Sequence, residues 1–158
     1  MPKIGKNCFI AENAAIIGDV TIGDDCSIWY GVVLRGDVNS IIIKDRVNVQ
    51  DNATIHTTYK QSVTILEDDV SIGHNAVIHG ARVGKGCLIG MGAVLLDNAE
   101  IAPGSIVAAG AVVLAKSKLD QGIYAGIPAK KVKEGSPELT EKAGHNAKQY
   151  MMYKDWFK

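Results

Sequence analysis

Three of the four histidines in the chain fall close together in the sequence, at His56, His74 and His79. The last two stand five positions apart in IGHNAVIHG (residues 72–80), among aliphatic residues. Three neutral imidazoles with one open position are typical of a catalytic zinc site, whereas structural zinc sites more often use four protein ligands. Zinc held in this way lowers the pKa of its bound water far below that of free water, to about 7, which supplies hydroxide at neutral pH. We therefore predict a metal centre with zinc as the first candidate, and with cobalt or iron as alternatives that imidazole also suits.

The alternative for any one of these residues is an ordinary hydrogen-bonded histidine at a surface or interface, and for His74 alone that interpretation is the better one. His56 and His79 each follow an aliphatic residue that is predicted to point inward, so both should point outward. Five residues of strand span at most roughly 17 Å, and a corner separates His74 from His79. A site shared between subunits removes this difficulty. It also predicts a closed cyclic oligomer, because every subunit both gives and receives a ligand.

Two polar segments near the histidines could surround a bound hydroxide. RGD contains Arg35 and Asp37, and NVQD ends in Gln50 and Asp51. Gln50 could donate or accept a hydrogen bond to the hydroxide, and Arg35 could hold an anionic product. Arg35, Asp37 and Asp51 could instead form an interfacial salt-bridge network without a chemical role, and the two interpretations are compatible.

A six-residue repeat must position these side chains. Aliphatic residues recur every six positions and resume after two interruptions, as in the first run of Ile4, Ile10, Ile16, Ile22, Ile28 and Leu34. A small residue stands four positions after each of them, as Ala76 does after Ile72. Such hexapeptides predict a mainly β protein, a parallel β-helix whose coils bury their apolar faces against one another. If three hexapeptides make one turn, residues 18 apart stack on adjacent rungs at roughly 4.8 Å.

The repeat divides the chain of residues 1–158 into parts of one predicted domain. Coils are expected over 1–116, a connector over 117–135 and a C-terminal helix over 136–158, with Ser136 as its N-cap and Pro137 in its first turn. The helix should lie along the side of the coils. Departures from the repeat at 34–42 and 56–65 are expected to be surface loops that carry the function, as is usual in solenoids.

Composition excludes several classes of partner and location. Lys plus Arg and Asp plus Glu number 17 each, so no net field would attract nucleic acid or anionic lipid. The longest apolar run, residues 106–115, is too short to span a bilayer, and the first ten residues lack the apolar segment of a secretory signal. Three cysteines without a CxxC pair fit a reducing compartment, which favours a cytoplasmic protein with free thiols even at the stacked positions Cys8 and Cys26.

The segments RGDVNSIIIKDRVNVQDNATIH, IGHNAVIHG and VGKGCLIGMGAVLLDNAEI together resemble the gamma-class carbonic anhydrase family over nearly the whole chain. The resemblance implies a left-handed, three-sided β-helix and a homotrimer that converts carbon dioxide to bicarbonate by attack of metal-bound hydroxide. By position it implies that the metal ligands are His56, His79 and a His74 from the neighbouring subunit. Gln50 then matches the residue beside the bound hydroxide or bicarbonate. The remaining matches are the polar network around the site and interface, Arg35, Asp37 and Asp51, and Asn48 of the same motif.

The chain lacks the glutamates that, in that family, carry the proton away from the site. Val38 stands in place of a glutamate, and the short segment TTYKQSVTI after His56 has no carboxylate. Removal of a proton from bound water is best served by a group that titrates near neutral pH, and only Tyr59, His145 or Tyr150 could help here. Two alternatives therefore stay open. One is a metal-binding or assembly homologue without rapid turnover, and the other is a hexapeptide acyltransferase that uses coenzyme A and a single histidine.

Overall fold

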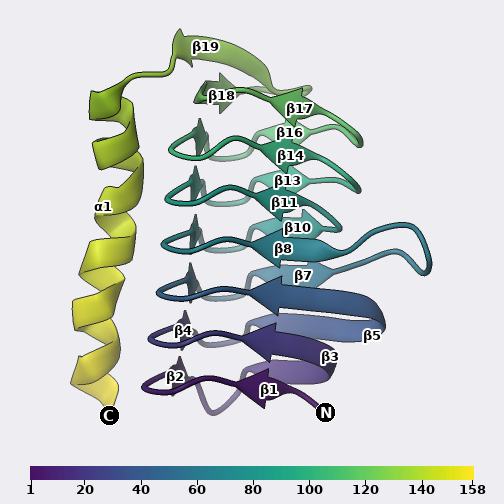
Figure 1. Ribbon diagram of the computed structural model, residues 1–158, viewed down its shortest axis with the longest axis vertical. Helices are drawn as coiled ribbons and strands as arrows, with labels where there is room; N and C mark the ends of the chain where they lie inside the picture. Colours follow the sequence, from purple (N-terminus) through teal and green to yellow (C-terminus); the bar gives the residue numbers. More distant parts are fainter.

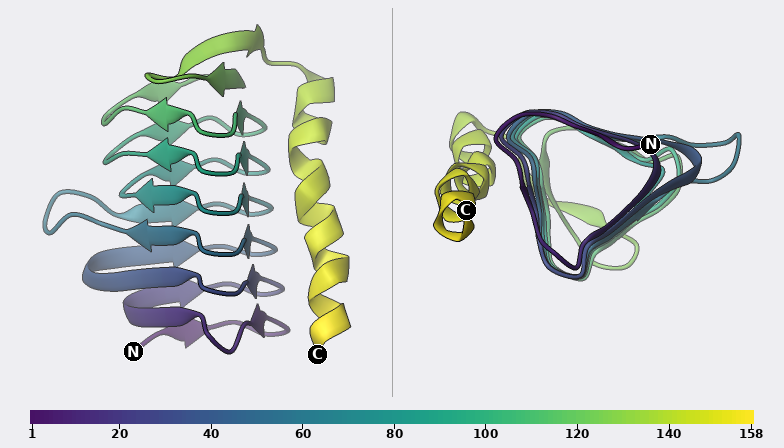
Figure 2. Two further views of the ribbon diagram at one scale, coloured as in Figure 1. Left: turned by 180° about the vertical axis from the view of Figure 1, so that it is seen from behind. Right: turned by 90° about the horizontal axis from the view of Figure 1, so that it is seen from below.

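Short parallel strands wind the chain into a left-handed β-helix of triangular cross-section, with one α-helix alongside (Figures 1 and 2). The computed structural model describes residues 1–158. The strands are β1 Lys3–Ile4, β2 Phe9–Ile10, β3 Ala15–Ile22, β4 Ser27–Ile28, β5 Val33–Ile43, β6 Asn48–Val49, β7 Thr54–His56, β8 Thr64–Leu66, β9 Ser71–Ile72, β10 Val77–His79, β11 Arg82–Val83, β12 Leu88–Ile89, β13 Val94–Leu95, β14 Glu100–Ile101, β15 Ile106–Val107, β16 Val112–Val113, β17 Lys118–Leu119, β18 Gly122–Ala125 and β19 Lys130–Glu134. The predicted fold class is confirmed.

The column of repeating aliphatic residues forms the interior of the helix. From Ile22 to Val113 its members are buried, and they join the small corner residues in one core of 28 buried side chains. Each coil therefore buries its apolar face against the coils above and below it, as a solenoid requires. Ile4 lies in the first coil, with no coil below it, and remains 48% exposed.

The two interruptions of the repeat have different structures. Residues 34–42 were expected to be a loop, but they belong to the 11-residue strand β5, which pairs with the 8-residue strand β3 on both sides of a register shift at the bend. The two strands bend outward together and pair on both sides of the bend, which gives most of the backbone there partners that an isolated loop would have to find elsewhere. Residues 57–63 do form a loop, which projects from the coils between β7 and β8 (Figure 1). We call it the 57–63 loop.

The coils continue beyond residue 116 into the segment expected to be a connector. β17 pairs with β14, and β18 pairs with β15. The repeat is hidden here because Tyr124, rather than an aliphatic residue, pairs with Val107, and the Tyr124 hydroxyl group donates to Asp120. β19 then turns back and pairs antiparallel with β18 at the end of the coils.

The C-terminal helix α1 spans Pro137–Tyr153 and packs against the side of the coils formed by β9 and β12. The predicted N-cap is confirmed, because the Ser136 side chain accepts a hydrogen bond from the Leu139 amide at 3.0 Å. A 3-10 helix, η1 Lys154–Phe157, follows, and aromatic contacts such as Trp29 with Tyr150 hold this end of the helix to the coils. No helix has the length and apolarity needed to cross a membrane. All three cysteines are free thiols.

Candidate metal centre

His56 and His79 meet on the outer wall of two adjacent coils. The two residues are partners in the pairing of β7 with β10, and Nδ1 of His56 lies 3.2 Å from Nε2 of His79. Two nitrogen ligands of a tetrahedral zinc ion, each bonded at 2.0–2.1 Å, lie about 3.3 Å apart. The stacking of coils thus brings two ring nitrogens to a spacing that suits one ion.

In each ring, the nitrogen that does not face the other histidine lies close to a carboxylate oxygen. Nε2 of His56 lies 2.8 Å from Oδ1 of Asp37, and Nδ1 of His79 lies 3.0 Å from Oδ1 of Asp97. Arg35 donates to the other oxygen of Asp37 at 2.5 Å. The hydrogen bond with His56 is the main reason that the pKa of Asp37 lies below its usual value, and Arg35 lowers this pKa further. Carboxylates in these positions fix the tautomer and orientation of ligating histidines.

The row of contacts from Asp37 to Asp97 is compatible with a cation between the rings. Three contacts, Asp37 with His56, His56 with His79, and His79 with Asp97, each need one proton. Two neutral imidazoles carry only two N–H groups. If a cation were held between Nδ1 of His56 and Nε2 of His79, each ring would keep one N–H group and donate it as a hydrogen bond to its carboxylate, so that all three contacts would be satisfied. The residues present therefore fit the metal that the sequence predicts.

His74 lies elsewhere in the chain. It occupies the corner before β10, whereas His79 ends that strand, so one straight side of the triangle separates them. Nδ1 of His74 pairs with Oδ2 of Asp51 at 3.0 Å. No three histidine, cysteine or acidic side chains within the single chain are placed to hold a metal. The structure thus brings two of the three predicted ligands together and leaves His74 apart.

Gln50 and Asp51 belong to the His74 corner, and Arg35 and Asp37 belong to the His56–His79 corner. Gln50 is buried and donates from Nε2 to Oδ1 of Asn48 at 3.0 Å, and Asn48 in turn donates to Ser71. Gln50 and His74 line one pocket of about 340 Å³ between the coils and α1. The predicted site residues therefore fall into two groups, one at each end of the side that contains β10.

The sequence analysis missed Asp97. The pKa of this carboxyl group would be raised by its partial burial, but hydrogen bonds with Ser62, His79 and Thr58 outweigh that effect and lower it. Asp97 follows His79 by 18 positions, which is the stacking distance of the repeat. That offset was the available signal, and inspecting the position stacked on each histidine would have found it.

The three candidate proton carriers occupy different places. Tyr59 is exposed on the 57–63 loop, and His145 lies on α1 beside Glu138 and Lys142. Tyr150 lines the pocket that contains His74, but burial, together with the charge of Asp51, raises the pKa of Tyr150 to about 12. Tyr150 therefore does not titrate near neutral pH.

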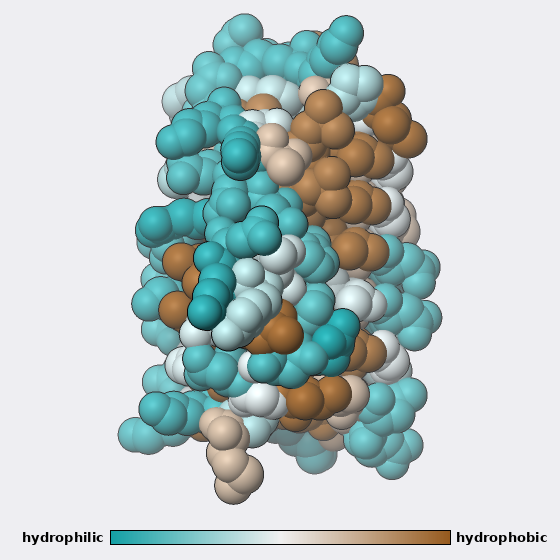
Figure 3. Space-filling view, turned by 90° about the vertical axis from the view of Figure 1, so that its right-hand side faces the viewer, coloured by the Kyte–Doolittle hydropathy of each residue, from teal (hydrophilic) through white to brown (hydrophobic).

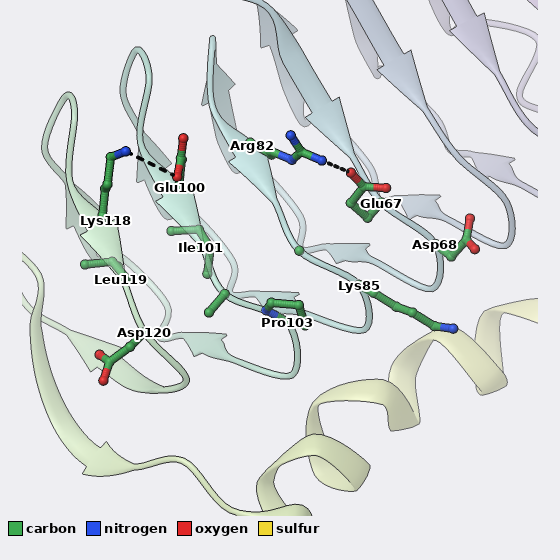
Figure 4. Close-up of a pocket in the computed structure, with 12 residues that line it drawn as sticks. Glu67, Asp68, Arg82, Lys85, Glu100, Ile101, Pro103, Lys118, Leu119 and Asp120 are labelled. Atoms are coloured by element: carbon green, nitrogen blue, oxygen red, sulfur yellow. Dashed lines mark hydrogen bonds and ion pairs between the residues drawn. The ribbon is translucent and has the colours of Figure 1, made fainter.

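A second groove, of about 630 Å³, lies on the side formed by β8, β11, β14 and β17 (Figure 4). Its outward side chains form ion pairs between neighbouring strands, Arg82 with Glu67 at 2.8 Å and Lys118 with Glu100 at 3.8 Å. It contains no histidine, so it takes no part in the metal centre.

Comparison with known proteins agrees with the repeat and with the predicted family. The family model described as bacterial transferase hexapeptide (six repeats) matches residues 1–36, 63–95 and 80–115. A probable carbonic anhydrase of Methanocaldococcus jannaschii is 47% identical, over 94% of this chain and 93% of the relative. YrdA of Escherichia coli is 42% identical, over 98% and 88%. The mitochondrial gamma carbonic anhydrase 2 of Arabidopsis thaliana is 40% identical over 95% of this chain, which spans 56% of that longer relative.

Solved structures separate close relatives from proteins that share only the fold. A Bacillus cereus crystal structure described as a putative acetyltransferase superimposes with a TM-score of 0.94 at 40% identity, over 99% of this chain and 91% of that one. The N-acyltransferase AntD of Bacillus cereus has a TM-score of 0.76 at 19% identity, over 92% and 89%, and this likeness concerns the fold alone. The repeat and the relatives at 40–47% identity show that the chain belongs to the gamma-class carbonic anhydrase family of hexapeptide-repeat proteins.

Proposed function

We propose that this protein is a metal-dependent carbonic anhydrase that hydrates carbon dioxide to bicarbonate. The ligands are His56 and His79 of one subunit and His74 of a neighbouring subunit. The observation that carries the proposal is the facing pair of ring nitrogens 3.2 Å apart, each ring backed by a carboxylate. Zinc is the first candidate, and cobalt or iron are the alternatives. The three free thiols are consistent with a reducing cytoplasm.

The side of the triangle between the two histidine corners has the character of a subunit interface. Its outward residues follow one another in register across the strands, namely Val33, Thr54, Val77, Val94 and Val112. Figure 3 shows hydrophobic side chains gathered in a band along the height of the molecule, on the side where β10, β13 and β16 lie. Burial of such a band against a second copy would bring the His74 corner of one subunit toward the His56–His79 corner of the next. Repetition of this contact closes a ring, and we propose the homotrimer that the family resemblance implies.

The chain's own residues have separable roles in the proposed reaction. His56, His79 and the neighbouring subunit's His74 would hold the metal, which when bound would supply a nucleophile for carbon dioxide by lowering the pKa of water to about 7. Gln50 is fixed through its amide nitrogen by Asn48, which leaves its carbonyl oxygen to accept a hydrogen bond in the site. Arg35 is held in place by Asp37, and its exposed guanidinium group can bind bicarbonate as the anion forms. Asp37, by accepting a hydrogen bond from Nε2 of His56, would leave the Nδ1 lone pair of His56 free to bind a metal.

A second candidate function is a metal-binding or assembly subunit without rapid turnover. The observation that favours it is the lack of a proton carrier near the histidines. Val38 and the 57–63 loop contribute no carboxylate, and the pKa of Tyr150 is about 12. An acyltransferase is less well supported, because the structural neighbours with that activity share only the fold.

One sample decides between the two candidates. Protein purified without air is analysed for metal content, and the same preparation is assayed for carbon dioxide hydration by stopped flow. We expect about one ion per chain together with measurable hydration, and loss of both in His79→Ala. A full complement of metal without hydration would establish the non-catalytic candidate, and a metal-free wild-type protein would overturn both.

A further inference from the structure

We propose that Asp97 is a positioning residue of the metal centre, held against His79 by the hydroxyl groups of the 57–63 loop. The inference deepens the proposed function, since it concerns how one of the proposed ligands is oriented. It assigns a role to a loop that carries no charged group other than Lys60.

The Asp97 carboxylate is tied on both oxygens. Oδ1 accepts a hydrogen bond from Ser62 Oγ at 2.5 Å and lies 3.0 Å from Nδ1 of His79. Oδ2 accepts from Thr58 Oγ1 at 3.0 Å. A carboxylate fixed in this way accepts the His79 Nδ1 proton and leaves the Nε2 lone pair directed at His56. Asp97 therefore selects the tautomer that can bind a metal.

The loop is fastened to the Asp97 turn by contacts that leave it little freedom. The Thr58 amide donates to Ser62 Oγ at 2.9 Å, which closes the loop on itself. Asn98 donates from its side chain to the Gln61 carbonyl oxygen at 3.2 Å. Three residues of the loop, Thr58, Gln61 and Ser62, thus contact residues 97 and 98, which lie in the turn between β13 and β14.

The backbone behind the two histidines is part of the same arrangement. Buried Thr64 donates to the His56 carbonyl oxygen at 3.0 Å and accepts from the Gly80 amide at 2.9 Å. A methyl group on Gly80 would collide with the side chains of Ser62 and Asp97. Because Gly80 has no side chain, the 57–63 loop and the Asp97 carboxylate can approach the His79 ring.

Asp97 differs from Asp37 in how it is held. Asp37 is oriented by one exposed arginine, Arg35. Asp97 is oriented by two neutral hydroxyl groups, so its charge is not cancelled by a neighbouring cation. A carboxylate that orients a ligating histidine typically contributes 10- to 100-fold to metal affinity. We expect losses of that size when Asp97 is removed, and a smaller loss when only its hydroxyl partners are removed.

The test uses the full-length protein and Co²⁺ as the probe, with affinity measured by competition against a chelator. Asp97→Ala should weaken Co²⁺ binding about 10- to 100-fold and alter the visible spectrum of the bound ion. Asp97→Asn, which keeps the size but not the charge, should lie between Asp97→Ala and wild type. The double variant Thr58→Val, Ser62→Ala should lose several-fold. Glu100→Ala removes the same charge close by in the sequence and should bind Co²⁺ like the wild type, with circular dichroism confirming the fold of every variant.

A second measurement separates this inference from the proposed function. Nitrogen-15 NMR of the metal-free protein, at a pH where imidazoles are neutral, should show His79 protonated at Nδ1, and Asp97→Ala should shift it toward the Nε2–H tautomer. This result stands even if the wild type binds no metal. An unchanged His79 tautomer in Asp97→Ala, or wild-type Co²⁺ affinity in both Asp97 variants, would overturn the inference.

Discussion

Histidines lie at both ends of the side that contains β10, but they differ in exposure and in their partners. At one end, His56 and His79 stack on adjacent coils, with side chains 18% and 30% exposed and a carboxylate behind each ring. At the other end, His74 is 40% exposed and contacts Asp51. Coil stacking alone assembles the first corner, whereas the second can complete a site only by meeting another molecule. Preorganisation within a chain and dependence on assembly thus coexist in the proposed metal centre.

The most direct test of whether two subunits share each site is to remove one histidine from each corner in separate chains. His79→Ala and His74→Ala should each lose metal by more than about 100-fold, because each removes one of three ligands from every site. When the two variants are unfolded together and refolded, sites that combine an intact corner from each should return. Random mixing gives about one quarter of the sites if neighbours share them around a closed ring.

Metal content and hydration of the refolded mixture measure this recovery. Each variant refolded by itself is the control. If all three ligands came from a single chain, no mixture could restore a site, and the shared arrangement would be wrong.

A substitution in the apolar band between the two corners can test the proposed interface without changing a residue of either corner. Val94 is half-buried on the outer face and precedes the buried Leu95. Val94→Asp should leave the coils folded but oppose burial of the band, because an unpaired charge at an interface costs several kcal/mol. We expect dissociation in analytical ultracentrifugation and at least about a tenfold loss of metal affinity.

Lys118→Asp supplies the matched control. It introduces the same residue on the side lined by ion pairs, where Lys118 is exposed (Figure 4). This variant should keep both the oligomer and the metal. Dissociation of both variants would mean that the apolar band is not the interface.

A smaller effect is expected from Gln50, and it tests whether the His74 corner contributes to the reaction as well as to metal binding. Gln50→Ala removes the amide that lies in the His74 pocket but none of the ligands. We expect metal content to be retained and hydration to fall about five- to tenfold, the value of one hydrogen bond. Stopped-flow rates at equal metal content measure the change, and an unchanged rate would exclude Gln50 from the reaction.

The smallest expected effect lies away from both corners. Ser136→Ala removes the cap of α1, which should lower the free energy of unfolding by about 1 kcal/mol, whereas Ser136→Gly should cost only a few tenths. Urea unfolding gives these values. Metal affinity should not change in either variant, and a parallel loss of metal would show that α1 supports the site more directly than its contacts indicate.

The sequence was sufficient for features that depend on local periodicity. The six-residue column predicted the coils, and Ser136 with Pro137 predicted where α1 begins. The loop expected at 34–42 is a strand, because its stability depends on a matching bend in β3 that lies one coil away. Tyr124 likewise fills the column in a way that a search for aliphatic residues cannot detect.

For the site, residue type and order were sufficient to group the histidines but not to place their partners. His56 and His79 meet because 23 residues separate them on neighbouring coils, a spacing that includes the 57–63 loop. Asp97 joins them through a side-chain contact between coils. The 18-residue offset of the repeat could have pointed to Asp97, but the 23-residue spacing of His56 and His79 could not be foreseen, because it depends on the length of the 57–63 loop.

The reversed strand β19 covers the C-terminal end of one sheet of the β-helix. A parallel coil extends by offering its open backbone groups to another coil of the same direction, and an unprotected rim of this kind invites end-to-end polymerisation. β19 runs against that direction and carries Lys130, Lys131 and Lys133 along the final rim. On the side of the coils that β19 covers, its reversed direction and its lysines therefore oppose the addition of a further parallel coil.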